Sequence, residues 1–252
     1  MLYDNGHGVA QDYKQAAAWY RKAAEQGYSK AQSNLGVLYT QGQGVQRNYA
    51  HAEALFRKAG EQGHADAQFN LGAAYGQGQG VTQNYTQAAN WYRKAADQGH
   101  ALAQFNLGAL YEKGQGLPQD YTQAATLYRK AAEQGVAGAQ FNLGVLYDNG
   151  QGVPQNHALA ASWYLKAAKQ GFASAQYNLG ASYYNGEGVP QDSAEAYFWL
   201  ELAAARVPIV NGPDGGELVR VRDAAAVRLT PEELSKVQER AARWLAEHPA
   251  QP

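Results

Sequence analysis

Residues 139–156 read AQFNLGVLYDNGQGVPQN, and this pattern returns along most of the chain. Its centre is an Asn-Leu-Gly triplet that recurs every 36 residues, with its leucine at Leu35, Leu71, Leu107, Leu143 and Leu179. A fixed period of about 20 to 50 residues is typical of solenoids, in which each unit buries its apolar face on its neighbours rather than around one central core. Function must then be sought on an extended surface.

Each unit contains two apolar patterns with helical spacing. In one unit, Ala67 and Leu71 share a face of a first segment, and Ala88, Tyr92 and Ala95 share a face of a second. Side chains three and four residues apart lie on the same side of a helix. We therefore expect two amphipathic helices in every unit.

Capping residues recur at the ends of these helices. An N-cap side chain precedes the second helix at Asp12, Asn48, Asn84, Asp120, Asn156 and Asp192. A partner for a capping box follows at Gln15, Gln87, Gln123 and Glu195. Left-handed C-caps are predicted at Gly42, Gly78, Gly114, Gly150 and Gly186 for the first helix, and at Gly27, Gly63, Gly99, Gly135 and Gly171 for the second.

A further row of glycines lies inside the first helix, at Gly36, Gly72, Gly108, Gly144 and Gly180. Glycine there costs about 1 kcal/mol relative to alanine, so we expect two helices to approach closely at this row. Small residues of the second helix would complete a seam for the tyrosines Tyr39, Tyr75, Tyr111, Tyr147 and Tyr183.

These blocks resemble the Sel-1-like repeat, a sub-class of the tetratricopeptide-type α/α solenoids with a longer turn between the helices. The resemblance covers about residues 2–206 in six copies, of which the first lacks most of its first helix. It implies an all-α fold, a right-handed α/α superhelical solenoid of about six 36-residue repeats with a C-terminal helical cap. We expect the solenoid at residues 1–206 and a loop with capping helices at 207–252.

The C-terminal segment departs from the period. Residues 207–216 contain several prolines and glycines and predict a loop, followed by a helix from Glu217 to Arg228. Thr230 then supplies an N-cap, Pro231 a first-turn proline and Glu233 a capping partner for a last helix. The pair resembles the C-terminal cap of bacterial Sel-1-like repeat proteins.

Composition excludes several classes of partner. Lys and Arg total 21 against 22 Asp and Glu, a net charge of -1, so nothing favours nucleic acid or an anionic membrane. Arg-Lys pairs recur in the second helix with an acid one turn later, which predicts a solvated and mutually neutralised ridge. No apolar stretch approaches the roughly 20 residues of a membrane span.

The compartment stays open. The chain has no cysteine, and Leu2-Tyr3-Asp4-Asn5-Gly6 matches the middle of a repeat rather than a signal peptide. If an upstream signal has been removed, the protein would be periplasmic or secreted in a bacterium; otherwise it would be cytoplasmic. The first repeat would leave Leu2, Tyr3, Trp19 and Tyr20 partly uncovered, which favours weak self-association.

Signals of catalysis are poor, and we expect no enzyme, no cofactor and no metal. The Gly76–Gly80 motif resembles a dinucleotide loop only superficially, because no strand precedes it. His64 and His100 occupy equivalent turns, and stacked repeats would hold them about 10 Å apart, too far to share a metal. No nucleophile, base and orienting group can be assembled.

The resemblance to tetratricopeptide proteins implies a concave, ligand-facing side on the first helices. Its rows are Phe69, Phe105, Phe141 and Tyr177; Val37, Ala73, Ala109, Val145 and Ala181; Thr40, Gly76, Glu112, Asp148 and Tyr184; and Gln41, Gln77, Lys113, Asn149 and Asn185. The candidate protein-binding residues among them are Phe69, Phe105, Phe141, Tyr177, Glu112, Lys113, Asp148, Asn149, Tyr184 and Asn185. Aromatic rings can bury ligand side chains while amides bond the ligand backbone.

Two structural readings compete with this site. The aromatic row could be core between repeats, and the row Asn34, Asn70, Asn106, Asn142 and Asn178 could bridge neighbouring repeats. Only Lys30 and Lys113 offer positive charge, so a free C-terminal carboxylate is not the expected ligand. The sequence favours a bacterial, non-enzymatic adaptor that binds a peptide or protein segment; a unit that assembles through self-association is the alternative, ahead of an enzyme or metal protein.

Overall fold

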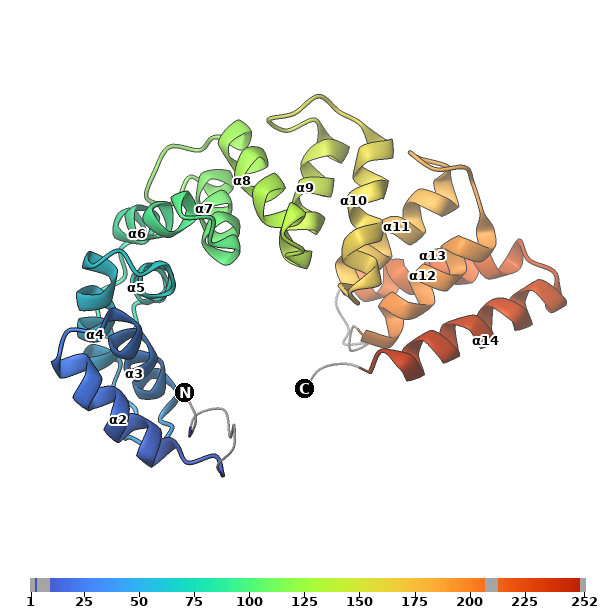
Figure 1. Cartoon of the computed structure of the whole chain (residues 1–252). Coiled ribbons are helices and arrows are strands. Elements are labelled where there is room, and N and C mark those ends of the chain that lie inside the picture. Colours follow the sequence, from blue (N-terminus) through green and yellow to red (C-terminus); the bar gives the residue numbers. More distant parts are fainter. Residues whose placement is uncertain (1–2, 4–9, 207–212, 250–252) are drawn as a thin grey trace. The chain divides into compact units, whose positions relative to one another are not determined.

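The computed structural model describes Tyr3 and residues 10–206 and 213–249, and this part of the chain is helical without strands (Figure 1). The all-α prediction is confirmed. The helices are α2 (Tyr13–Glu25), α3 (Ser29–Gln41), α4 (Tyr49–Glu61), α5 (Ala65–Gln77), α6 (Tyr85–Asp97), α7 (Ala101–Lys113), α8 (Tyr121–Glu133), α9 (Ala137–Asn149), α10 (His157–Lys169), α11 (Ala173–Asn185), α12 (Ser193–Arg206), α13 (Pro213–Val227) and α14 (Pro231–Glu247).

The chain forms two compact units, residues 1–120 with α2 to α7 and residues 121–252 with α8 to α14. From α2 to α7 and from α8 to α13 each helix packs on the next along the chain, both inside a repeat (α5 on α6, α9 on α10) and between repeats (α4 on α5, α10 on α11), whereas α14 packs on α12. This is the nearest-neighbour packing of a solenoid. The sequence-based division at residue 207 stays a prediction.

Five of the six predicted N-caps and all ten predicted C-cap glycines are confirmed, whereas the cap at Asp120 and the capping boxes with Gln15, Gln87, Gln123 and Glu195 stay predictions. The side chains of Asp12, Asn48, Asn84, Asn156 and Asp192 accept hydrogen bonds from first-turn backbone N–H groups. All ten predicted C-cap glycines have positive φ, from 63° to 90°. A reciprocal capping box forms at Thr230 and Glu233, where the backbone N–H of Thr230 lowers the pKa of the Glu233 carboxyl.

The glycines inside the first helices mark the close helix approach that the sequence predicts. A β-carbon on Gly72 would stand 2.6 Å from the ring of Tyr92, and one on Gly144 would stand 2.6 Å from the ring of Tyr164. The covering side chain belongs to the second helix of the same repeat, not to the row that begins with Tyr39. Each glycine therefore opens a slot for one large side chain.

The tyrosines that we expected at the glycine seam contact arginines of the second helices. Arg57 donates to the hydroxyl of Tyr75 at 2.7 Å, and this hydrogen bond raises the pKa of Arg57. The same bond joins Arg21 to Tyr39, Arg93 to Tyr111 and Arg129 to Tyr147. Among the described ion pairs, none joins these arginines to the acid one turn later. A hydroxyl of the next repeat is thus a partner of each of these arginines, Arg57 also pairs with Glu53 of its own helix, and the solvated, neutralised ridge stays a prediction.

A glycine in the turn between the two helices contacts the backbone of the preceding repeat. A β-carbon on Gly80 would stand 2.4 Å from the carbonyl oxygen of Tyr49, and one on Gly152 would stand 2.2 Å from the carbonyl carbon of Tyr121. Gly80 also has φ +77°. The two backbone segments are in direct contact here, and any side chain larger than that of glycine would overlap the preceding repeat.

A buried glutamine ladder joins the repeats, with members Gln32, Gln68, Gln104, Gln140 and Gln176. Gln68 is typical: its Nε2 donates to the carbonyl of Gly60 at 2.9 Å, and its Oε1 accepts from Nε2 of Gln98 at 2.7 Å. The sequence analysis did not single out this row. Buried amides of this kind need both partners, because an unmade hydrogen bond costs about 1–3 kcal/mol.

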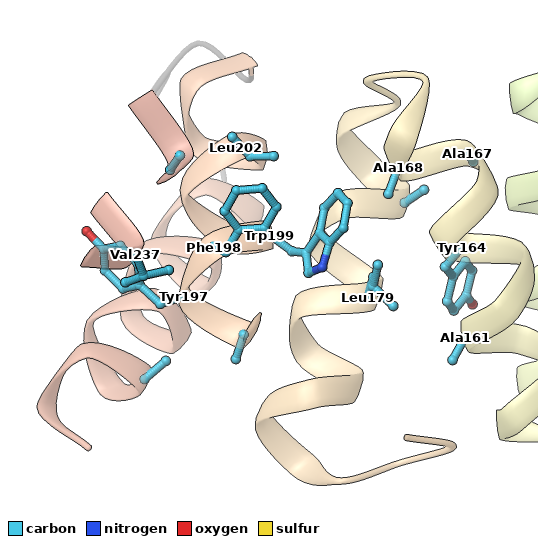
Figure 2. Close-up of a cluster of buried hydrophobic side chains, with 14 of the residues drawn as sticks. Ala161, Tyr164, Ala167, Ala168, Leu179, Tyr197, Phe198, Trp199, Leu202 and Val237 are labelled. Carbon is cyan, nitrogen blue, oxygen red and sulfur yellow. The ribbon is translucent and has the colours of Figure 1, made fainter. Parts of the chain in front are cut away.

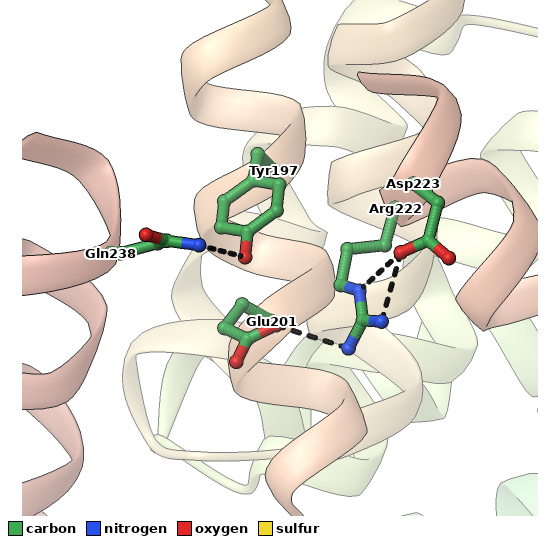
Figure 3. A network of polar contacts seen from close by, with 5 residues as sticks. All are labelled: Tyr197, Glu201, Arg222, Asp223 and Gln238. Atoms are coloured by element: carbon green, nitrogen blue, oxygen red, sulfur yellow. Dashed lines mark hydrogen bonds and ion pairs between the residues drawn. The ribbon is translucent and has the colours of Figure 1, made fainter. Parts of the chain in front are cut away.

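The last helices cover an apolar side of α12. Tyr197, Phe198, Trp199 and Leu202 of α12 are buried, and Val237 of α14 packs against the same cluster (Figure 2). A polar network joins the three helices at one edge, where Arg222 of α13 contacts Glu201 of α12 and Gln238 of α14 donates to the hydroxyl of Tyr197 (Figure 3).

The first of these helices begins earlier than the sequence suggested. We expected a loop through residue 216 and a helix from Glu217 to Arg228, but α13 runs from Pro213 to Val227. Proline is favoured in the first turn because its φ is already helical, and this outweighed the two glycines that follow. Residues 207–212 of the expected loop lie outside the described part.

The turn contact can be tested by replacing Gly80 with alanine. We expect Gly80→Ala to lower the free energy of unfolding by at least about 3 kcal/mol, because backbone atoms cannot move aside cheaply. Gly63→Ala is the matched control: Gly63 also has positive φ but has open space around the new methyl group. It should cost only about 1–2 kcal/mol. Urea unfolding followed by circular dichroism measures both; equal losses would contradict the contact.

The glutamine ladder makes a second prediction. Gln68→Ala removes the hydrogen bonds of this side chain to the Gly60 carbonyl and from the Gln98 amide, and should destabilise the protein by about 2 kcal/mol. Gln87→Ala, on an exposed helical position, should change stability by less than about 0.5 kcal/mol. Thermal melting of the two variants makes the comparison, and a neutral Gln68→Ala would show that the ladder does not stabilise the stack.

Candidate functional site

A small pocket lies among α3, α4 and α5 of the first unit. Its volume is about 150 Å³, and we call it the Asn70 pocket; its lining is Thr40, Tyr49, Ala52, Glu53, Phe56, Asn70, Ala73, Ala74, Gln77 and Gln79. Thr40, Ala73 and Gln77 belong to the rows that the sequence analysis placed on the ligand-facing side. The remaining lining comes from α4, from Asn70 and Ala74 of α5, and from the turn after α5.

The pocket contains an amide that other repeats use internally. The side chain of Asn106 interacts with the hydroxyl of Tyr92 and tends to lower the pKa of Tyr92, and Asn178 does the same for Tyr164. The residue equivalent to these tyrosines beside Asn70 is Phe56, which has no hydroxyl. No hydrogen bond of the Asn70 side chain is found among the described residues, so its amide is available to a ligand.

The equivalent place in the second unit carries a polar cluster. His157 Nδ1 lies 2.6 Å from Oδ1 of Asp148, and the hydroxyl of Tyr164 donates to Oδ2 of Asp148 at 3.3 Å. Burial raises the pKa of Tyr164, and the nearby Asp148 charge raises it further. About two fifths of each of the Asp148 and His157 side chains is exposed, so both can contact a ligand.

Sequence analysis named Asp148 but missed His157. The available signal was a break in the period, because His157 starts a second helix where four others start with Tyr13, Tyr49, Tyr85 and Tyr121 and the last starts with Ser193. Two repeats thus differ in chemistry at one register: hydroxyl, carboxylate and amide groups in the first unit, and a carboxylate-imidazole pair in the second.

The aromatic row is half-buried. The ring of Phe69 lies 5.9 Å from that of Tyr92 and stacks on His100 at 4.6 Å, and the ring of Phe141 contacts Tyr164 and Phe172. Phe105 and Tyr177 are half-buried as well. Each of these rings is therefore partly packed and partly exposed, and its role in binding stays a prediction.

The other candidate residues lie near the ends of the first helices. Lys113, Asn149 and Asn185 are exposed, and Glu112 is half-buried. Tyr184 is covered by the C-terminal segment: the Arg228 guanidinium lies 3.9 Å from its ring centroid, and Nη1 of Arg228 donates to its carbonyl oxygen. The ligand-facing row is thus obstructed at the last repeat.

The histidines that recur between repeats have a structural role. Nδ1 of His64 accepts from the backbone N–H of Ala67, and Nδ1 of His100 accepts from that of Ala103, so each caps a helix. Within the described residues no cluster of three potential metal ligands occurs. The same part of the chain also has no helix long and apolar enough to cross a membrane.

A family model described as the Sel1 repeat matches residues 1–28, 29–64, 65–100, 101–136, 137–172 and 173–206. The structure of a Sel1 repeat protein from Oxalobacter formigenes is 34% identical and has a TM-score of 0.77, with 92% of this chain and 94% of that chain covered.

Two further structures are more distant. A protective antigen with an SLR fold from uropathogenic Escherichia coli is 26% identical with a TM-score of 0.39, over 98% of this chain and 82% of that one. A Sel1 repeat protein from Klebsiella pneumoniae is 23% identical with a TM-score of 0.49, over 88% and 99%. None of the curated proteins compared with the chain matches it.

The repeat length, the capped helix pairs and the six matches of the family model agree. The chain belongs to the Sel1 repeat family, whose fold is an all-α solenoid.

Proposed function

We propose that this chain is a non-enzymatic adaptor that binds an extended peptide segment of another protein, with the Asn70 pocket as one docking point. Sel1 repeat proteins are generally protein-interaction scaffolds, which supports the class. The observation that carries the proposal is the Asn70 amide, which has no partner among the described residues and lines a pocket on the expected ligand-facing side.

The chemistry of the lining suits a peptide backbone. Asn70, Gln77 and Gln79 each offer a donor and an acceptor, and such amides can bond the N–H and C=O groups of an extended chain. Ala73 contributes little bulk, which leaves space for a ligand side chain. Glu53 is ion-paired with Arg57, so the pocket adds no unpaired negative charge.

Phe56→Tyr tests the pocket by restoring the hydroxyl that other repeats have. The new hydroxyl should hydrogen bond Asn70 and withdraw it from the ligand, so peptides selected from a random phage-displayed library on the native protein should bind at least about tenfold more weakly. Stability should change by less than about 1 kcal/mol, because the neighbouring repeats accommodate tyrosine at this register. Fluorescence anisotropy of labelled peptides measures the affinity.

The reverse change one repeat later is the matched control. Tyr92→Phe removes a hydroxyl beside Asn106 and does not touch the lining of the Asn70 pocket. Selected peptides should keep their affinity for it. Peptides that bind the native and Phe56→Tyr proteins equally would place the docking point elsewhere and sink this part of the proposal.

Self-association is a second candidate, favoured by the exposure of Trp19. Trp19 of α2 is 57% exposed, whereas Trp91 at the same register of α6 is 7% exposed because it packs near Gly60 of the preceding repeat. Tyr20, which we also expected to be uncovered, is buried at 7%, since it packs into the cluster that contains Leu35 and Leu38. Leu2 lies outside the described residues.

Trp19→Glu tests this candidate. If α2 faces another copy through Trp19, the native chain should sediment as a concentration-dependent monomer-dimer mixture, and the variant should stay monomeric because a carboxylate cannot be buried there unpaired. Lys14→Glu, at an exposed position of α2, is the control and should not change the association. A monomeric native chain at high concentration would refute assembly through this face.

A further inference from the structure

Departures from the 36-residue period gather at the end of the second unit. Where other repeats carry the acids Glu25, Glu61, Asp97 and Glu133, the fifth carries Lys169. Where they carry Gln62, Gln98, Gln134 and Gln170, the sixth carries Arg206. Where five second helices carry Ala18, Ala54, Asn90, Thr126 and Ser162, α12 carries Phe198. Each change adds positive charge or an aromatic ring in one neighbourhood.

These residues adjoin a cavity between α12 and α14, which we call the cap cavity. It has a volume of about 290 Å³, and its lining is Lys169, Phe198, Trp199, Arg240, Arg243, Trp244 and Glu247. Three aromatic side chains and three cations face a single carboxylate. The lining therefore carries a net positive charge, although the net charge of the whole chain is -1.

Contacts around the cavity hold its aromatic walls in place. Arg240 is ion-paired with Glu195 and lies 3.8 Å from the ring centroid of Phe198. Trp244 has two neighbours: the ring of His248 stacks on it with centroids 4.2 Å apart, and the guanidinium of Arg206 lies 5.0 Å from its ring centroid.

The other two cations of the lining, Lys169 and Arg243, have no described partner. No hydrogen bond or ion pair of Lys169 or Arg243 is found among the described residues. Trp199 also differs from its equivalents: Lys22, Lys94 and Lys166 each lie over the tryptophan of their own helix, whereas α12 has Leu202 at that position. The indole N–H of Trp199 has no partner in the described part.

We propose that the cap cavity binds an acidic peptide segment that inserts an aliphatic side chain between its carboxylates. The apolar walls would receive the side chain, and Lys169 and Arg243 would pair with the carboxylates, interactions that are stronger than neutral hydrogen bonds. The volume is near the lower limit of small-ligand sites, about 300 Å³, which suits one side chain and its neighbours. Three cations and a net charge of -1 are too few for a nucleic-acid track. This site shares no residue with the Asn70 pocket and does not depend on it.

The test uses the full chain and a capped Glu-Leu-Glu tripeptide as the probe. Of five tryptophans in the protein, Trp199 and Trp244 line the cavity. Their indole N–H signals in ¹⁵N-labelled protein should shift saturably with the peptide, while that of Trp91 stays unchanged. The Gln-Leu-Gln and Glu-Gly-Glu peptides should each bind at least about tenfold more weakly, because each lacks one half of the recognised chemistry.

Lys169→Glu with Arg243→Gln should weaken Glu-Leu-Glu binding by at least about tenfold. The first change restores the residue type of the other repeats, so the fold should tolerate it. Lys236→Gln, on the same helix α14 but outside the cavity, is the control and should bind as the native protein does.

Three results would overturn the proposal. The first is the absence of a saturable shift at Trp199 and Trp244, and the second is equal binding by the double variant. The third is an equal response to inorganic phosphate or to anionic phosphatidylserine vesicles, which would assign the cations to a phosphate group rather than to a peptide.

Discussion

The turn glycine resting on the backbone of the preceding repeat is the contact on which the stacking depends. A β-carbon on Gly80 would stand only 2.4 Å from a carbonyl oxygen, so the two backbone segments approach as closely as glycine alone permits. Each repeat therefore meets its neighbour at one fixed distance. The regular hydrogen bonds between glutamines 30 residues apart and between arginines and tyrosines 18 residues apart follow from that constraint.

The repeats differ from one another in chemistry only where a side chain departs from the 36-residue pattern. Phe56 in place of tyrosine releases an amide, and His157 in place of tyrosine creates a pair with Asp148. Lys169 stands where other repeats have an acid, and Arg206 stands where they have a glutamine, and both lie near the aromatic cap cavity. Only Arg206 removes a bond of the glutamine ladder, that to Oε1 of Gln176, so different repeats can carry different side-chain chemistry on one scaffold.

Much of the fold could be predicted from the sequence because its determinants are local. Cap side chains and left-handed glycines act within a few residues, and the interior glycine row correctly indicated close helices. Contacts between repeats could not be read in this way. Nothing near Arg57 in sequence indicates that Tyr75 of the next repeat would be its partner, and even within a repeat the glycine row gave no information about which ring would cover it. The candidate site was predicted as whole rows, whereas Asn70 and His157 acquire their chemistry from a residue on another helix.

The glutamine ladder has a direction, and this bears on how such an array can lengthen during evolution. Each glutamine pair lies within one repeat, as Gln68 and Gln98 do, and the buried glutamine also donates to a carbonyl of the preceding repeat, so a duplicated interior unit would bring its own pair and bond to its predecessor. The sixth copy cannot serve in this way. Its second glutamine is replaced by Arg206, which bonds the carbonyl of His248, and Oε1 of Gln176 has no partner among the described residues. The sixth copy therefore lacks the glutamine pair that an interior copy carries, although Gln176 still donates to Ala168 of the preceding repeat.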